Sequence, residues 1–250
     1  MKDLLKFEFY KLKKQKSFYI CTAVILAMSF LGALLTKLLA DNNAGLNTVV
    51  LSGQSTMLSA ISSSNFTMIC SIFIALFVCA DHSEQTIKNI YSRGFSKGTV
   101  YFAKYTVGVV ATATMFVLTL LFSFAIGSVM FGNKTAESGN IFGFIIGQLI
   151  LCIAYTSFVF AISLSLKKVG SSIALAILGP MLVSMLLSLA DAFLKIDKFK
   201  ISSYWIEGFV SDLSIVSTKP SRLAVCIILS AIYAIVFAAT GFFINKKQEN

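Results

Sequence analysis

Apolar positions along the chain gather into six long stretches separated by shorter polar segments. About 20 predominantly apolar residues are enough for a helix to cross the roughly 30 Å of bilayer hydrocarbon. The six stretches meet this length and lie at about 18–40, 61–80, 102–131, 141–166, 170–194 and 222–244. This pattern predicts an all-α integral membrane protein, with one transmembrane domain of six helices over residues 1–250.

The overall composition excludes the soluble classes of protein. Hydrophobic residues make up 57% of the chain and charged residues 13%, and the mean hydropathy is +0.84. Soluble proteins carry about 25% charged residues. In addition, 23 Phe and 8 Met would expose large apolar patches in water. The chain is therefore expected to lie in a membrane.

Residues that bind metals and cofactors are scarce. The only histidine is His82, and the five cysteines lie inside apolar runs with no pair at ligand spacing. Zinc and haem sites need such ligands, and an odd number of cysteines in apolar runs gives no disulfide framework. The lone histidine also leaves an intramembrane hydrolase without its usual base. We expect no metal site, no catalytic residue and no cofactor bound by this chain.

The formal net charge of +10 first suggests a nucleic-acid partner. Only Arg93 and Arg222 among the 21 basic residues are arginines, however, and arginine is the residue that base readers favour. Fourteen of the 21 flank the spans on one side, including both termini. Because cytoplasmic loops are enriched in Lys and Arg, both termini are predicted to be cytoplasmic. The charge thus indicates orientation in a bilayer, and no nucleic acid is expected as a partner.

The interiors of the predicted spans lack ionisable residues. Lys37 and Asp191 lie close enough to span ends to reach the interface. Ion-coupled carriers need titratable or coordinating groups near the midplane. The chain also has no Gly-rich loop followed by Lys and Ser or Thr that would cradle phosphate. We therefore expect the energy for any transport to come from a separate protein.

Two features of the later spans concern helix packing. Gly139, Gly143 and Gly147 recur every four residues where the fourth span begins, so another helix could approach closely there. Ordinary packing within the chain and a dimer interface both fit this spacing. Pro180 lies in the small-residue fifth span and is expected to kink or break it. Such a helix suits either a pathway lining or a tight interface.

Residues 1–16 are predicted to form an interfacial helix. Leu5, Phe9 and Leu12 fall within a narrow arc at helical periodicity, and lysines occupy much of the remaining surface. The alternative is a simple basic flank that orients the first span.

The connection from Asp81 to Lys104 is longer than joining two helices requires. Within it, Ile87, Ile90 and Tyr91 share one face of a short amphipathic run that carries both charge signs. A second protein is expected to dock on this segment, 81–101. The candidate docking residues are Glu84, Gln85, Thr86, Ile87, Lys88, Asn89, Ile90, Tyr91 and Arg93.

The order of residues in this connection is familiar. An acidic residue precedes Thr86-Ile87-Lys88-Asn89, and Ser92-Arg93-Gly94, Ser96-Lys97 and Lys104 follow. This pattern resembles the membrane subunit of type-two ABC exporters, as does the amino-terminal Glu8, Lys11-Leu12 and Lys14 pattern of an elbow helix. The six-span arrangement is similar as well. The Glu-Ala-Ala signature of importer-type permeases is not found.

The resemblance implies a division of labour between subunits. The loop after the second span would form a coupling helix in a groove of a separate ATPase, which would bind ATP and Mg²⁺. Two membrane subunits, identical or homologous, would pair around a central pathway. The resemblance assigns the coupling role to Glu84, Thr86, Ile87, Lys88, Asn89 and Arg93, and it is weaker at Gln85, where many members have Gly.

The segment 195–221 between the last two spans is predicted to be extracellular. Its aromatic residues stand among charges, which is typical of a short interfacial or re-entrant helix and equally of a plain aromatic belt.

These expectations lead to one functional hypothesis and two rivals. The chain resembles permeases of bacitracin and lantibiotic resistance and of cytolytic-peptide export, which implies a bacterial plasma-membrane exporter of an amphipathic peptide or hydrophobic drug. One rival is a non-transporting sensor or immunity protein that binds a peptide at the outer face. The other is a channel or secondary carrier that needs no nucleotide.

Overall fold

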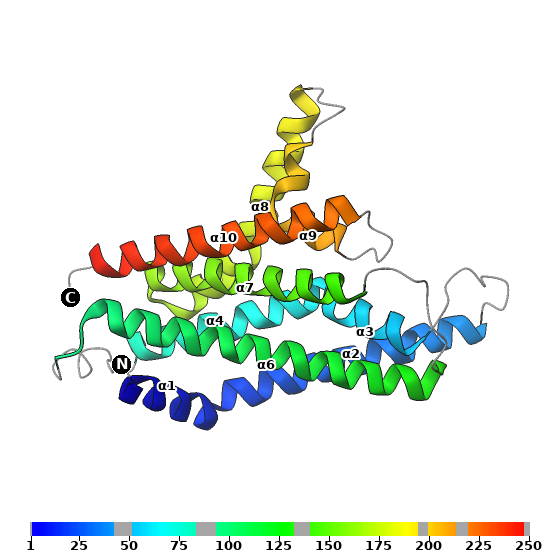
Figure 1. Cartoon of the computed structure of the whole chain (residues 1–250), viewed down its shortest axis with the longest axis horizontal. Helices are drawn as coiled ribbons and strands as arrows, with labels where there is room; N and C mark the ends of the chain where they lie inside the picture. The colour runs from blue at the N-terminus through cyan, green and yellow to red at the C-terminus, as the bar shows by residue number, and fades with distance from the viewer. Residues whose placement is uncertain are drawn as a thin grey trace.

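The computed structural model describes residues 2–42, 52–83, 94–132, 141–194, 200–213 and 220–247. Within these segments the chain is almost entirely helical and contains no strand. The helices form an elongated bundle in which α1 and the end of α10 lie at the same end (Figure 1). The predicted all-α fold is confirmed.

Six of the described helices are long and apolar enough to cross a membrane, in agreement with the predicted number. Their mean hydropathy lies between 1.7 and 2.5. They are α2 (Lys16–Asn42), α4 (Ser64–Ser83), α6 (Lys97–Phe131), α7 (Ile141–Leu166), α8 (Val169–Leu194) and α10 (Pro220–Lys247). Four shorter elements accompany them, namely α1 (Lys2–Lys14), α3 (Gly53–Ser62), η1 (Ile201–Tyr204) and α9 (Ile206–Asp212).

The second span is present as one helix, α4, which begins at Ser64, three residues after the start expected for the stretch 61–80. The backbone of Ser63 is extended, at φ −68° and ψ 138°, so it separates α3 from α4. Its hydroxyl donates to Ala60 O (2.9 Å) and accepts from Phe66 N (3.3 Å), which satisfies backbone groups on both sides of the break. A capping serine in the polar run 62–65 therefore sets the start of the span.

Helix α3 packs closely against the end of α6. A Cβ atom added at Gly127 would lie 2.7 Å from Thr56 Cβ and 2.9 Å from Gly53 Cα. Only glycine permits this approach of the two backbones. The contact continues where Gly53 N donates to Gly132 O at 3.2 Å.

Helix α6 begins at Lys97, five residues before the start expected from its apolar pattern. Ser96 caps it, because its side chain accepts a hydrogen bond from Thr99 N at 3.3 Å. Lys104 therefore lies about two turns after the first residue of the helix.

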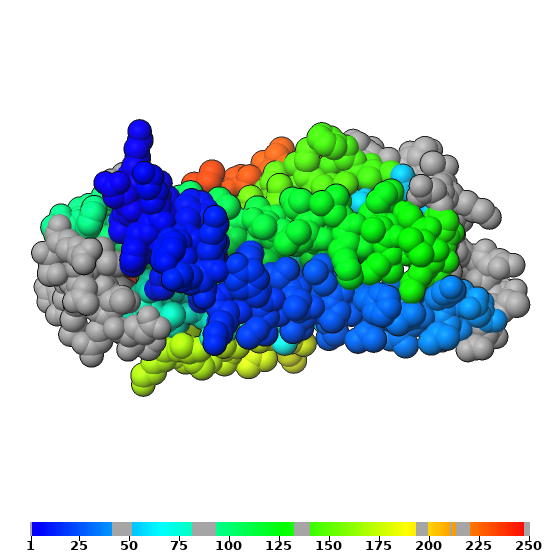
Figure 2. Space-filling view, turned by 90° about the horizontal axis from the view of Figure 1, so that it is seen from below, coloured from blue at the N-terminus to red at the C-terminus, as the bar shows by residue number. Residues whose placement is uncertain are grey.

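The helices differ in how much of their surface the bundle covers. In α4 and α7, 61% of the apolar stretch is buried, against 11% in α8. Helix α8 leaves the bundle at an angle (Figure 1), whereas α1 and α2 lie along one side of it beside α6 (Figure 2). Thus α4 and α7 form the centre, and α8 offers most of its surface to lipid or to another subunit.

Candidate functional site

The docking residues predicted from the sequence lie outside the described part of the chain. They occupy the segment 84–93, between the end of α4 and the turn at Gly94. They are Glu84, Gln85, Thr86, Ile87, Lys88, Asn89, Ile90, Tyr91 and Arg93. The structure does describe the helices that flank this segment, and an unexpected cluster of charges joins them.

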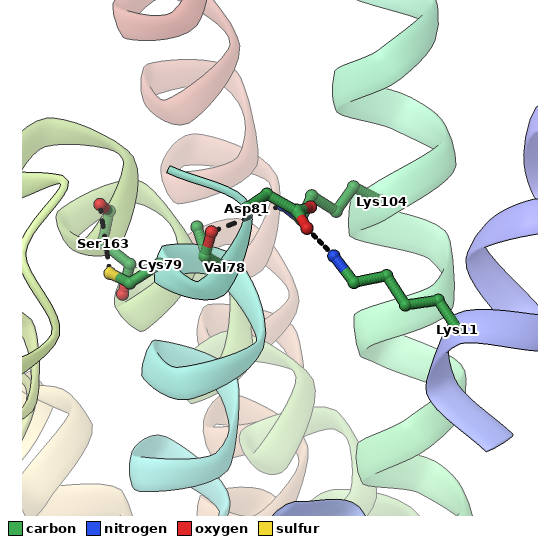
Figure 3. A network of polar contacts seen from close by, with 6 residues as sticks. All are labelled: Lys11, Val78, Cys79, Asp81, Lys104 and Ser163. Carbon is green, nitrogen blue, oxygen red and sulfur yellow. Dashed lines mark hydrogen bonds and ion pairs between the residues drawn. The ribbon is translucent and has the colours of Figure 1, made fainter. Parts of the chain in front are cut away.

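Asp81 occupies the last turn of α4 and is 1% exposed. One carboxylate oxygen pairs with Lys11 of α1, and the other accepts from Lys104 of α6, so the aspartate lies between two lysines (Figure 3). Lys104 is itself 4% exposed and also donates to Val78 O at 3.3 Å. We call Lys11, Asp81 and Lys104 the charged hub.

The charged hub holds three helices together by ion pairing in a buried place. Leaving one buried charge without its partner typically costs about 3–5 kcal/mol, whereas the complete pair is close to neutral in stability. The two lysines and the single carboxylate must therefore stay together. The three helices that carry them, α1, α4 and α6, must stay together as well. Any displacement of the end of α4 is passed to the other two helices.

A second contact extends from the same turn of α4. Cys79 Sγ lies 3.8 Å from Ser163 O of α7 and 3.3 Å from Ser172 Oγ of α8, as Figure 3 shows for Ser163. Helix α10 is connected through α6, where Tyr101 donates to Ala238 O (2.6 Å). The end of α4 that leads into the segment 84–93 thus contacts helices from both halves of the chain.

Helix α1 packs against this region. Its buried face is rotated slightly from the expected face of Leu5, Phe9 and Leu12. Its buried residues are Leu4, Glu8 and Leu12, whereas Leu5 and Phe9 are half-buried. Leu4 packs against Val100 and Ala103 of α6, which sets the orientation of the helix. Glu8 is 1% exposed, and among the described residues its Oε2 has no hydrogen-bond partner.

Of the glycines predicted for helix packing, Gly147 lies in an ordinary contact within the chain. A Cβ atom at Gly147 would meet Ile227 of α10 and Leu213 at 3.4 Å. Gly143 is half-buried on the same helix, and Gly139 lies outside the described residues. Helix α8 continues through Pro180 without a break.

Pro180 instead accepts a hydrogen bond from the segment 200–213, which we call the hairpin. Trp205 Nε1 donates to the carbonyl oxygen of Pro180 at 3.0 Å, and Tyr233 of α10 donates to Tyr204 O at 3.0 Å. Ile206 and Phe209 are at most 1% exposed. The segment thus contains two short helices, η1 and α9, that pack against α8 and α10.

The hairpin also brings a carboxylate among the spans, where none was expected. Glu207 Oε1 accepts a hydrogen bond from the hydroxyl of Tyr155, which is 2.5 Å away on α7. The sequence indicated that the spans lack ionisable centres, and this holds for the spans themselves. It misses a charge delivered between them by a connecting segment.

Comparison with known proteins adds one finding. A family model described as "ABC-2 family transporter protein" matches residues 4–183 of the chain. The matched stretch contains the charged hub and Pro180 but ends before the hairpin and α10. No curated protein matches the chain significantly.

Proposed function

The chain belongs to the ABC-2 family of transporter proteins, and from this premise we propose that it is the permease subunit of an ATP-driven exporter. Family membership and the six apolar helices make it a multi-pass membrane protein and a transport component rather than a catalyst. The proposal concerns the energy source, the direction of transport and the substrate.

The observation that carries the proposal is the position of the charged hub beside the segment 84–93. A separate ATPase subunit docks on that segment through the apolar face of Ile87, Ile90 and Tyr91. Three residues before the segment begins, Asp81 ties α4 to α1 and α6. A push on the segment therefore moves three helices as one body, which is what rigid-body gating requires.

In this mechanism the chain binds no cofactor of its own. ATP and Mg²⁺ bind to the partner ATPase, and nucleotide binding favours one of two packings of a permease pair. The second permease subunit, identical or homologous, packs against an apolar face that the chain leaves open. The exposed Leu178, Met181 and Met185 of α8 provide such a face.

The proposed substrate is an amphipathic peptide or a hydrophobic drug, expelled from a bacterial plasma membrane as a form of antimicrobial resistance. A groove of about 340 Å³ between α2, α3 and α4 supports this substrate class. Its lining mixes apolar residues such as Met28 and Phe66 with the hydroxyl groups of Ser29, Thr56 and Ser59. Uncharged polar groups beside apolar ones suit a molecule with both kinds of surface.

Co-purification with the products of neighbouring genes tests the proposal. Wild-type protein should recover an ATPase, and its ATP hydrolysis should be stimulated by exported peptides. Ile87→Asp and Arg93→Glu should each reduce ATPase recovery and transport by about tenfold or more, because they alter the apolar face and the charge of the docking helix.

Lys37→Glu is a matched control, since it reverses a charge on an exposed residue at the other end of α2. It should leave both measurements unchanged. Peptide binding without any ATPase partner would instead support a sensor or immunity protein. Flux through the purified chain without nucleotide would support a channel or carrier.

A further inference from the structure

The groove between α2, α3 and α4 has an apolar floor and a polar rim. Figure 1 shows α3 beside α2, near the end of the bundle that lies away from α1. The lining residues that are almost inaccessible, at 2% or 3% exposure, form the floor, and they are Ile25, Ala33 and Phe66. The lining residues that are exposed form the rim and include Thr36, Ser59 and Asn65. A molecule that fits this groove therefore combines an apolar part with a polar one.

The hydroxyl groups of the groove already use their protons. Ser29 and Thr36 each donate to the carbonyl oxygen four residues earlier in α2, both at 2.9 Å. Ser59 donates to Thr56 O at 3.0 Å in α3. A hydroxyl has one proton but two lone pairs, and none of these three hydroxyl groups accepts a hydrogen bond from the described residues. The groove therefore presents acceptors to a ligand. It lies within a span, since Ser29 is the 14th of the 27 residues of α2.

Asn65 adds an amide to the rim. An amide offers one acceptor oxygen and two N–H donors, and the side chain of Asn65 forms no hydrogen bond with the part of the chain that the structure describes. Next to Phe66 and Ile69, which also line the groove, a polar group without a partner is unfavourable. A ligand hydroxyl or primary amide satisfies Asn65 in both directions, because each can donate and accept a hydrogen bond.

Charge and volume limit the ligand further. None of the described residues that line the groove is charged. An ammonium or carboxylate group there would lack a counter-charge beside an apolar floor, which is strongly unfavourable. At about 340 Å³ the groove lies near the lower end of the range for small-molecule sites, which is about 300–1,000 Å³. It therefore holds one uncharged chain or ring and not a whole peptide.

We propose that the groove recognises an uncharged hydrogen-bond donor, the hydroxyl or primary amide of an amphipathic molecule whose apolar chain lies on the floor. The donor binds the hydroxyl oxygens of Thr36 and Ser59 and the amide of Asn65 at the rim. The inference rests on the proposed function for its link to export, and it narrows the substrate to molecules, or parts of molecules, of this class. Binding itself can be measured without the ATPase.

Gly32 allows the groove to be filled without disturbing the bundle. It lines the groove, and a Cβ atom added there would meet nothing within 4 Å beyond its own turn of helix. Gly32→Leu therefore adds a side chain to the groove without a clash, and leucine suits a helix better than glycine does. Gly170→Leu is the matched control, since Gly170 of α8 has the same free space but does not line the groove.

The purified full chain in lipid nanodiscs is photolabelled with an analogue of 1-dodecanol that carries a diazirine in its chain. Mass spectrometry should find saturable labelling on the lining residues of α2, α3 and α4. 1-Dodecanol should compete about tenfold better than dodecyl methyl ether, which lacks only the donor. Dodecanoate and dodecyltrimethylammonium should also compete poorly, because they are charged. Gly32→Leu should abolish labelling of the groove, and Gly170→Leu should leave it unchanged.

Equal competition by the alcohol and the ether, at matched concentrations in the membrane, would overturn the proposal, as would unchanged labelling in Gly32→Leu. Asn65→Leu should weaken the apparent affinity about fivefold, which corresponds to one hydrogen bond. If Gly32→Leu lowers the thermal unfolding midpoint, Asn65→Leu decides instead, and an unchanged affinity counts against the site. If Gly32→Leu alters the size of the complex in native mass spectrometry but not the labelling, another protein covers the groove and the proposal is wrong.

The two proposals fail in different ways. If no ATPase co-purifies but labelling of the groove depends on the donor, the exporter assignment is wrong and the binding site stands. If the ATPase is recovered and exported peptides stimulate it equally in wild type and Gly32→Leu, the exporter stands and the groove has no part in substrate recognition.

Discussion

The charged hub and the hairpin anchor opposite regions of the bundle by different chemistry. The hub joins α1, α4 and α6 through one buried carboxylate and two lysines. The hairpin is held by several separate hydrogen bonds. Some join neutral groups, such as Trp205 to Pro180 and Tyr233 to Tyr204, and others involve the charged side chains of Asp191, Glu207 and Arg222. A buried ion pair fails abruptly when one member is lost, whereas separate hydrogen bonds can be lost one at a time. The hub is therefore suited to moving helices together, and the hairpin to small local adjustments.

Removing the carboxylate of the hub should have the largest effect on stability. Asp81→Asn leaves the Lys11 and Lys104 ammonium groups without their shared counter-charge, which should lower the free energy of unfolding by about 3 kcal/mol or more. The five described cysteines are buried and free, so a thiol-reactive dye can follow thermal unfolding of the purified protein. A large fall in the unfolding midpoint is expected.

The exposed Asp41→Asn should leave that midpoint within experimental error, and Asp81→Asn combined with Lys104→Met should recover part of the loss. A midpoint for Asp81→Asn equal to that of wild type would show that the hub does not hold the three helices together.

The hub was beyond prediction from sequence, although its members were noticed. In the sequence, Lys11 lies in the predicted interfacial helix, and Asp81 and Lys104 lie at the ends of a predicted loop. Asp81 follows Lys11 by 70 positions, so no local pattern connects them. The sequence contained one signal, the capping residue Ser96. A helix that begins after Ser96 places Lys104 inside a span, where a lysine needs a partner.

Other parts of the structure could be predicted from the sequence to different degrees. The six spans follow from apolar length alone, since nothing else in a chain of this composition can cover 30 Å of hydrocarbon. The break at Ser63 depends on capping by one serine of the polar run 62–65, a local signal that the apolar length of a stretch does not contain. The position of Glu207 beside α7 could not be predicted from the sequence at all. The sequence pattern suggests that a charge in a connecting segment is solvent-exposed. The hydrogen bond from Tyr155 to Glu207, and that from the neighbouring Trp205 to Pro180, place the segment among the spans.

Single hydrogen bonds of the hairpin should have intermediate effects. Trp205→Phe removes the donor to Pro180 O, and Tyr155→Phe removes the donor to Glu207, so each should cost about 1 kcal/mol, somewhat more where the acceptor is charged. The dye assay should show modest falls in the unfolding midpoint, each well below that of Asp81→Asn. A fall as large as that of Asp81→Asn would mean that the hairpin is as cooperative as the hub.

The smallest effect is expected at the ion pair between Asp212 of the hairpin and Arg222 of α10. Arg222 Nε donates to Asp212 Oδ2 at 2.8 Å, but the two side chains are 26% and 32% exposed. Partly exposed pairs contribute about 0.2–1 kcal/mol, and salt screens them. Asp212→Asn should thus lower the unfolding midpoint slightly at low salt, because it removes the ion pair but keeps the donation from Arg222 to Ser203 O (2.7 Å). The difference from wild type should shrink as NaCl is raised toward about 1 M. The deficit of Asp81→Asn should persist at the same salt, because Asp81 and Lys104 are buried. If both deficits shrink equally, the hub is as accessible to ions as the hairpin, and the contrast between the two regions fails.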